Sequence, residues 1–251
     1  MGAPENESAR QSMSFDYDTL PAGYYDRIHQ RRSGAQSRWH HQKFARFARA
    51  MAAGGRHLDI GCGPGTFIGT LPSEECESTG IDIAAAQIAY AEAHHGGPKR
   101  RFQVVAAGPL PFEADAFDVV SMIELIEHLP HERNMELLGE ALRVIRPGGR
   151  ILVSTPNYRS LWPWIEKLAA RFGAMDYGEQ HITRYHRHSL RDLLTAAGAT
   201  DVAVEGYMLI APFTAALTWR LADLVERLEP AALVNHFGLL LFASGTKKDG
   251  V

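Results

Sequence analysis

The sequence predicts an α/β protein built on a doubly wound, mostly parallel β-sheet. Short segments rich in β-branched residues alternate with amphipathic helical segments, an order that places helices on both faces of one sheet. A glycine-rich loop closes the first of these strands, at the kind of position where such sheets bind ligands. The 251 residues, 45% of them hydrophobic and 22% charged, suffice for one large domain. We therefore expect a three-layer sandwich.

Seven segments have the composition of strands: residues 56–60, 78–83, 101–105, 117–122, 150–155, 200–209 and 237–245. Helical periodicity predicts helices over residues 37–51, 84–95, 132–145, 160–172, 189–198 and 213–228. Ser189 is the expected N-cap of the fifth of these helices, and Gly198 is its stop. We expect residues 1–20 to form a disordered tail and residues 21–251 a single domain, with helical insertions at about 158–180 and 211–235.

Composition and charge narrow the class of protein. The net charge of −3 argues against a general nucleic-acid binder. Cys62 and Cys76 lack the spacing of a metal site or a disulfide framework, which favours a reducing cytoplasm. The N-terminus lacks the apolar segment of a signal peptide, and no apolar run reaches the roughly 18 residues of a membrane span. Between Arg27 and Arg49, seven Lys or Arg occur without an acidic residue; a solvated helix face is expected, and RNA phosphate or a lipid headgroup is the alternative partner.

The glycine loop lies in "LDIGCGPGTF", where Gly61, Gly63 and Gly65 form G-x-G-x-G between a strand and a helix. Missing side chains let a ligand approach the backbone there. Asp82 ends the second strand, and a carboxylate at that position can bind two ribose hydroxyls. Loop and carboxylate together indicate either a nicotinamide cofactor or S-adenosylmethionine.

Further motifs, "GIDI", "LPFEADAFDVV", "ELIEHL" and "LRVIRPGGRILVSTPN", occur in the order and spacing of the class I S-adenosylmethionine-dependent methyltransferases. The chain resembles this family over roughly residues 38–210. The resemblance implies a Rossmann-like, seven-stranded doubly wound sheet with an antiparallel last strand. It implies these cofactor contacts: Asp59, Gly61, Gly63 and Gly65 on the methionine and ribose side, Asp82 at the ribose hydroxyls, Ile83 at the adenine, and Met122 and Ile123 beside the sulfonium. The family usually has an acid where this chain has Ala106 and Ala107, so the adenine amine must be read by backbone or water, or the affinity is reduced.

The stretch "SMIELIEHL" carries the candidate chemistry. Glu124, Glu127 and His128 would leave one face of a single helical turn. His128 is the expected general base, oriented by Glu127, unless the pair only braces the turn before Pro130. His181 follows the fifth strand and is expected beside the same pocket as a second catalytic residue. The four groups, Glu124, Glu127, His128 and His181, would suit Mg²⁺, Mn²⁺ or Zn²⁺.

This pattern resembles two branches of the family, the ubiquinone-biosynthesis O-methyltransferases and the metal-dependent 2′-O-methyltransferases of small-RNA 3′ ends. The apolar stripe of residues 161–172 is expected to be core, while both insertions are expected to roof an acceptor pocket. We therefore expect O-methylation of a small apolar or aromatic acceptor, with peripheral membrane contact by an insertion helix as a further option. The alternatives are RNA 2′-O-methylation and cofactor binding without catalysis.

Overall fold

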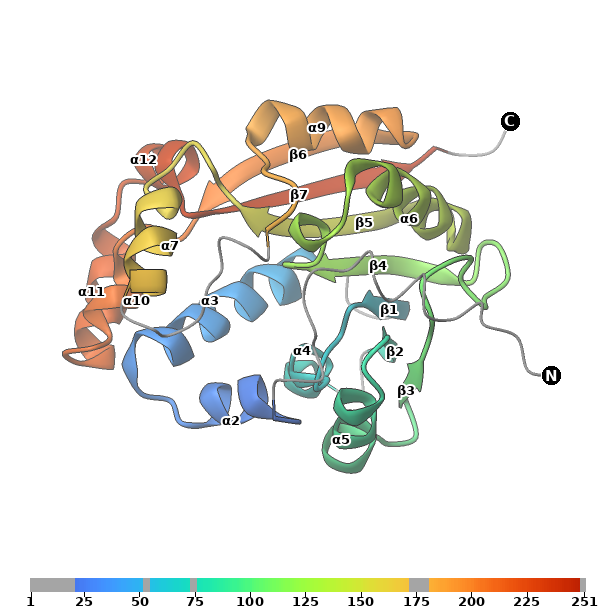
Figure 1. The fold of residues 1–251 in the computed structure, drawn as a ribbon, viewed down its shortest axis with the longest axis horizontal. Coiled ribbons are helices and arrows are strands. Elements are labelled where there is room, and N and C mark those ends of the chain that lie inside the picture. The colour runs from blue at the N-terminus through green and yellow to red at the C-terminus, as the bar shows by residue number, and fades with distance from the viewer. Residues whose placement is uncertain (1–20, 52–54, 73–75, 172–180, 249–251) are drawn as a thin grey trace.

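The computed structural model describes residues 21–51, 55–72, 76–171 and 181–248; the tail expected at 1–20 lies outside them. Its centre is a seven-stranded sheet of order β3-β2-β1-β4-β5-β7-β6 (Figure 1). The strands are β1 (Arg56–Ile60), β2 (Glu77–Asp82), β3 (Arg100–Val104), β4 (Phe117–Ile123), β5 (Ile145–Pro156), β6 (Ala199–Tyr207) and β7 (Leu240–Lys247). Strands β1 to β5 are parallel, and β7 runs antiparallel between β5 and β6. The predicted Rossmann-like topology is confirmed.

Helices cover both faces of this sheet. They are α2 (Tyr24–Gln30), α3 (Gly34–Ala50), α4 (Thr66–Thr70), α5 (Ala85–His95), α6 (His131–Val144), α7 (Trp162–Arg171), α9 (Arg187–Ala196), α10 (Ala211–Thr214), α11 (Trp219–Leu228) and α12 (Ala231–Phe237). Strand alternation divides the core between the two faces. On β4, Val120 and Met122 pack with α6 and α9, whereas Val119 packs with Phe44 and Phe47 of α3.

Two helix boundaries differ from the predictions. His186 rather than Ser189 is the N-cap of α9: its ring accepts from the Ser189 N–H, and the Ser189 hydroxyl accepts from the His186 N–H. The helix expected over 213–228 is interrupted because α10 ends at Thr214 and Thr218, in extended conformation, caps α11 through the Leu221 N–H. The hydrophobic periodicity of the sequence continues across the break between α10 and α11, so it does not reveal where the helix is interrupted.

The insertion helices gather at one end of the molecule. Figure 1 shows α7, α10, α11 and α12 grouped beyond the ends toward which β4 and β5 point. In an open α/β sheet this is the end that binds ligands. A search of the described residues found no helix long and apolar enough to cross a membrane.

Candidate functional site

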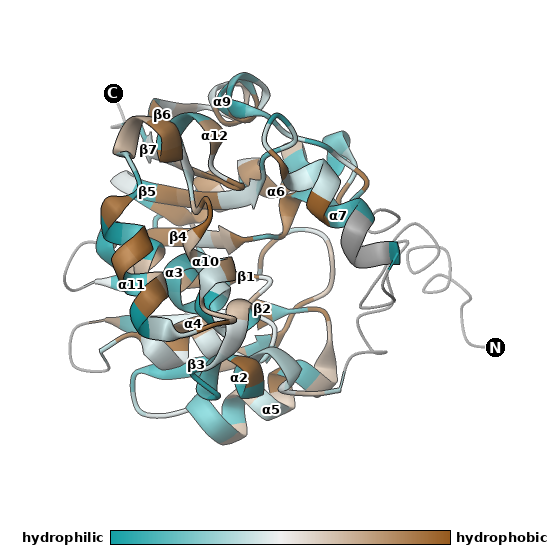
Figure 2. Cartoon of the chain, turned by 90° about the vertical axis from the view of Figure 1, so that its left-hand side faces the viewer, coloured by the Kyte–Doolittle hydropathy of each residue, from teal (hydrophilic) through white to brown (hydrophobic). Residues whose placement is uncertain are grey.

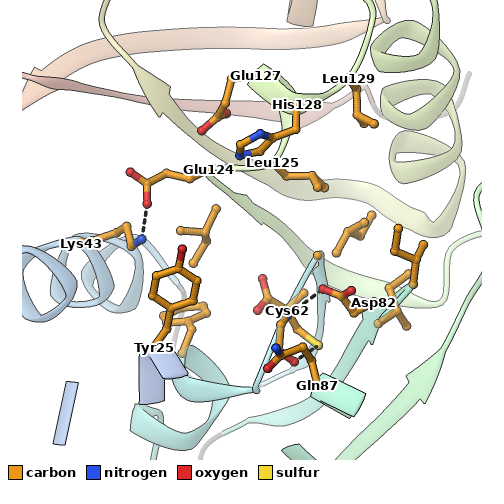
Figure 3. A pocket seen from close by; sticks show the side chains of 18 of the residues that line it. Tyr25, Lys43, Cys62, Asp82, Gln87, Glu124, Leu125, Glu127, His128 and Leu129 are labelled. Carbon is orange, nitrogen blue, oxygen red and sulfur yellow. Dashed lines mark hydrogen bonds and ion pairs between the residues drawn. The ribbon is translucent and has the colours of Figure 1, made fainter. Parts of the chain in front are cut away.

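A cavity of about 940 Å³ opens at the carboxyl ends of the strands. One end lies at the glycine loop and Asp82, and the other is lined by residues of α3, α7 and α10. Figure 3 shows Asp82 at the first end and Lys43 of α3 across the cavity from it. This volume is near the upper limit of the roughly 300–1,000 Å³ found for ligand pockets.

Asp82 organises the glycine loop at the first end. Its Oδ2 accepts a hydrogen bond from the Gly63 N–H at 2.9 Å, and its Oδ1 accepts from the Ala84 N–H at 2.9 Å. The Gly61 N–H donates to the Ile81 carbonyl at 2.8 Å, which joins the loop to β2. Burial raises the pKa of Asp82, and hydrogen bonds from the backbone of Ala84, Gly63 and Ile83 oppose that rise. The loop is thus held in place by a carboxylate that also lines the cavity.

Asp59 is a second buried carboxylate at this end. The Ser121 hydroxyl donates to its Oδ1 at 2.5 Å, and His57 Nε2 lies 2.8 Å from the same hydroxyl. Burial raises the pKa of Asp59 to about 7, and the charge of Asp82 adds to the rise. A ligand that brings positive charge would stabilise both carboxylates in their ionised form.

Most of the predicted cofactor residues line the cavity, with two exceptions. Asp59, Gly61, Gly63, Asp82, Ile83 and Ile123 are among the lining residues. Met122 is fully buried in the core on the opposite face of β4 from Ile123, because successive strand residues alternate, so its side chain does not line the cavity and its place beside a sulfonium stays a prediction. Gly65 lies behind the lining, where an added Cβ would meet the Phe102 ring at 2.7 Å. Ala106 and Ala107 line the cavity.

Glu124 does not share a helical face with Glu127 and His128. Its backbone is left-handed, with φ of 52°, and the short 3₁₀ turn begins only at Ile126. The turn in direction sends its carboxylate toward α3, where it forms an ion pair with the Lys43 ammonium (Figure 3). Lys43 is 5% exposed and lines the cavity. The four-residue ligand set therefore loses Glu124 in this arrangement.

The other three predicted residues converge. Glu127, His128 and His181 each offer one ligand atom within 4.8 Å of the others, and the two imidazole centroids lie 5.1 Å apart. His181 lies beside Glu127 and His128 because Thr183, two residues later, is hydrogen-bonded to the 3₁₀ turn and the residue that follows it. Its N–H donates to the Glu127 carbonyl at 3.0 Å, and its hydroxyl donates to the Leu129 carbonyl at 2.7 Å.

Glu127 is the unusual member of this trio. It is fully buried, and neither of its carboxylate oxygens has a hydrogen-bond partner among the described residues. Burial raises the pKa of Glu127 to about 8, and the negative charge of Glu124 contributes. Burial also lowers the pKa of His181, against the opposing charge of Glu166. At neutral pH the trio therefore combines a protonated carboxyl with a neutral imidazole, which suits proton transfer or cation binding.

The second end of the cavity is lined by aromatic side chains: Tyr25, Trp39, Phe44, Trp162 and Phe213. On α7, Trp162, Ile165 and Glu166 face the cavity, whereas Leu161 and Trp164 are 63% and 71% exposed. The predicted core stripe of residues 161–172 is therefore wrong at these two positions, and Phe172 lies outside the described residues.

Sequence reasoning missed two charged residues of this end. Lys43 was counted only as part of a basic segment, and no local pattern distinguishes it from its neighbours. Glu166 was passed over inside an apolar helix, although a single acid in "WPWIEKLA" was a usable signal of a polar contact.

Comparison with known proteins gives a consistent result. A family model described as a methyltransferase domain matches residues 25–204. The ubiquinone biosynthesis O-methyltransferase of Idiomarina loihiensis is 29% identical over 160 residues, 61% of this chain and 65% of that protein. The enzyme of the same name from Pseudomonas putida is 33% identical over 112 residues, 43% of this chain and 47% of that protein. The matched region thus spans less than two thirds of either relative.

Solved structures show the same fold. A SAM-dependent methyltransferase from Thermotoga maritima superposes with a TM-score of 0.62 at 18% identity, covering 89% of this chain and 94% of the other. Phosphoethanolamine N-methyltransferase 2 of Haemonchus contortus, in complex with S-adenosyl-L-methionine, gives a TM-score of 0.59 at 18% identity, covering 83% and 53%. Such distant likeness establishes the architecture of the chain and leaves its acceptor open.

Proposed function

The chain belongs to the methyltransferase-domain family of class I S-adenosylmethionine-dependent methyltransferases, and we propose that it methylates an oxygen of a small apolar or aromatic acceptor. One observation carries the proposal: the same cavity runs from the glycine loop to the Glu127–His128–His181 trio. A donor at one end and an acceptor at the other would meet in line, which is the alignment a methyl displacement needs. The names of the O-methyltransferase relatives support oxygen as the accepting atom.

At the donor end, the charges of the cavity complement those of the cofactor. S-adenosylmethionine supplies the methyl group as a sulfonium and ends in an ammonium and a carboxylate. Asp82 binds the ribose hydroxyls, and Asp59 stabilises the nearby positive charge.

At the acceptor end, the aromatic lining binds an apolar or aromatic molecule, and the trio handles its proton. His128 and His181 are the catalytic bases. Glu127, protonated at neutral pH, donates a hydrogen bond to the acceptor oxygen or to an imidazole and so holds the reacting group in place.

The trio also fits a divalent cation. A buried carboxylate whose two oxygens have no partner among the described residues, next to two imidazoles, is a suitable donor set for Mg²⁺, Mn²⁺ or Zn²⁺. Such an ion would lower the pKa of a bound hydroxyl. The residues that would hold it are Glu127, His128 and His181, with Glu124 joining only if its ion pair with Lys43 opens.

The RNA alternative gains no support from the basic segment. Arg38 binds Asp223 at 2.8 Å, Arg46 pairs with Glu205, and Lys43 pairs with Glu124 inside the cavity. Three of the seven cations are thus ion-paired within the molecule, and a fourth, Arg27, donates to the Ala22 carbonyl at 2.8 Å.

Peripheral membrane contact is a second proposal, supported by the surface of α11. Leu224 and Leu228 of this helix are 53% and 70% exposed, Leu217 just before it is 76% exposed, and Figure 2 shows brown bands along the helix. Arg220 and Arg227 flank them, without an ion pair among the described residues. An exposed apolar stripe edged by arginine suits an anionic lipid surface. We expect the protein to sediment with phosphatidylglycerol vesicles and the double variant Leu224→Ser, Leu228→Ser to remain in solution; equal sedimentation of both would contradict the proposal.

The main proposal is tested in two steps. Calorimetry should detect S-adenosylhomocysteine binding and no NAD binding; the reverse result would overturn the assignment. A panel of catechols and phenols, followed by S-adenosylhomocysteine release, then identifies acceptors. Activity that stops with EDTA and returns with Mg²⁺, Mn²⁺ or Zn²⁺ supports the cation, whereas chelator-insensitive activity lost in His128→Ala leaves catalysis by the imidazole.

A further inference from the structure

His181 is supported from behind by a buried carboxylate on the insertion helix α7. Glu166 Oε1 lies 2.8 Å from His181 Nδ1, and the two side chains are only 7% and 4% exposed. The Tyr158 hydroxyl donates to the same Oε1 at 2.9 Å and lies 2.8 Å from His181 Nδ1. Glu166, Tyr158 and His181 are thus hydrogen-bonded to one another, and Glu166 and Tyr158 both lie on the Nδ1 side of the His181 ring.

The contacts determine where His181 carries its proton. A carboxylate only accepts hydrogen bonds, and the Tyr158 proton is already given to Glu166. A contact of 2.8 Å between Nδ1 and Oε1 is stable only if Nδ1 bears a hydrogen. In the neutral imidazole the other nitrogen, Nε2, is then the basic one.

That basic nitrogen is the one His181 can offer to the trio. Glu127, His128 and His181 each offer one ligand atom within 4.8 Å of the others, and since Nδ1 of His181 is hydrogen-bonded to Glu166, we assign Nε2 as the atom directed at the other two. We propose that Glu166 is a positioning residue that holds His181 with its proton on Nδ1, so that Nε2 accepts a proton from the acceptor or holds a cation, while Tyr158 secures Glu166. The inference rests on the proposed function only in taking His181 as a participant in the reaction.

Bracing α7 alone does not account for a carboxylate at this position. The helix is already joined to α3 by the Trp39–Trp162 contact, with ring centroids 5.5 Å apart. Burying a carboxylate is costly, and an apolar side chain of similar volume would pack α7 as well. Control of the imidazole tautomer is what the carboxylate adds, as in other carboxylate–histidine pairs.

The test reads the tautomer directly. Protein labelled with ¹⁵N-histidine is examined by long-range ¹H–¹⁵N NMR, and His181→Gln assigns the His181 signals. We expect the pattern of a neutral ring protonated on Nδ1 in the wild type. Glu166→Leu removes the acceptor and should shift His181 toward the tautomer protonated on Nε2. Glu166→Gln, which keeps the size and polarity and so protects the fold, should give a smaller shift in the same direction. Glu132→Gln, an exposed acid on α6, is the matched control and should change nothing.

Function supplies the second readout. Methyl transfer should fall about 10–100-fold in Glu166→Gln with unchanged affinity for S-adenosylhomocysteine. If His181 keeps the wild-type pattern in both Glu166 variants, or is protonated on Nε2 in the wild type, the inference is overturned. A wild-type protein that binds no S-adenosylhomocysteine would instead overturn the proposed function, and the NMR result would still decide the role of Glu166.

Discussion

The two ends of the cavity are built from different kinds of structure. At the glycine loop, ligand-facing groups come from two neighbouring strand ends, and their polar atoms are bonded to one another, as Asp82 is to Gly63. At the opposite end, side chains come from α3, the 3₁₀ turn, α7 and the segment around His181, and the Glu127 oxygens lack partners among the described residues. The sheet makes the first end rigid before any ligand binds. The second end depends on tertiary packing and on a balance of buried charges.

The largest expected effect is a loss of folding stability caused by a substitution in the glycine loop. Gly65→Ala adds a Cβ 2.7 Å from Phe102 and 2.9 Å from Ala91 at φ of 72°. Overpacking and left-handed strain together should lower the free energy of unfolding by about 3–4 kcal/mol. Urea unfolding measures this loss.

Gly63→Ala is the matched control, because its φ is 51° but nothing lies within 4 Å of an added Cβ. It should cost only about 1–2 kcal/mol of stability while weakening cofactor binding, since the new methyl enters the cavity. Equal stability losses in both variants would mean that packing behind the loop is unimportant.

The next effect concerns the charge balance at the acceptor end. Because the pKa of Glu127 is about 8 in the folded chain and its ordinary value is 4.5, the folded chain binds one more proton than the unfolded chain between these two values. The stability of the wild type must then fall as pH rises through this window. Between pH 5 and pH 8, the free energy of unfolding should fall by about 3 kcal/mol more in the wild type than in Glu127→Gln, which has no proton to lose at this position.

Urea unfolding of the two apo proteins at pH 5, 6, 7 and 8 measures the difference. Asp59, whose pKa is about 7, titrates in the same window and contributes equally to both proteins, so subtraction isolates Glu127. Parallel pH profiles would show that Glu127 is ionised in the folded protein and would remove the neutral carboxyl from the proposed reaction.

Asp82→Ala tests the rigid end by binding. Loss of the charged hydrogen bonds to ribose should weaken the binding of S-adenosylhomocysteine by roughly 1.5–3 kcal/mol. The Gly63 N–H also loses its acceptor, which adds to the loss of affinity. Calorimetry measures the affinity, and thermal unfolding verifies that the fold survives. Unaltered affinity in a folded variant would exclude Asp82 as the ribose ligand.

The contrast between the two ends also explains what sequence could predict. Strand order and the glycine loop follow from alternation and from motifs contained within ten residues, so β1, its loop and the position of Asp82 at the end of β2 agree with the predictions. The position of Glu124 depended on a left-handed residue that helical spacing does not reveal. Lys43 reaches its partner across 81 residues, and no local pattern specifies that contact. The single acid of α7 indicates a polar contact for Glu166 but does not identify His181, 15 residues away, as the partner. Met122 faces the core and its neighbour Ile123 lines the cavity, because side chains alternate along a strand.

The smallest expected effect concerns the adenine amine, for which this chain has Ala106 where the family usually has an acid. Ala106 lines the cavity and is exposed, so an aspartate there has room to accept a hydrogen bond from the adenine amine. Ala106→Asp should therefore strengthen the binding of S-adenosylhomocysteine by less than about 1 kcal/mol or leave the affinity unchanged, because one solvent-accessible hydrogen bond contributes little. Calorimetry with S-inosylhomocysteine, which lacks the amine, is the control and should show no gain. A large loss of affinity in Ala106→Asp would mean that the loop at residues 105–110 does not contact the adenine, and that the base is read from another wall of the cavity.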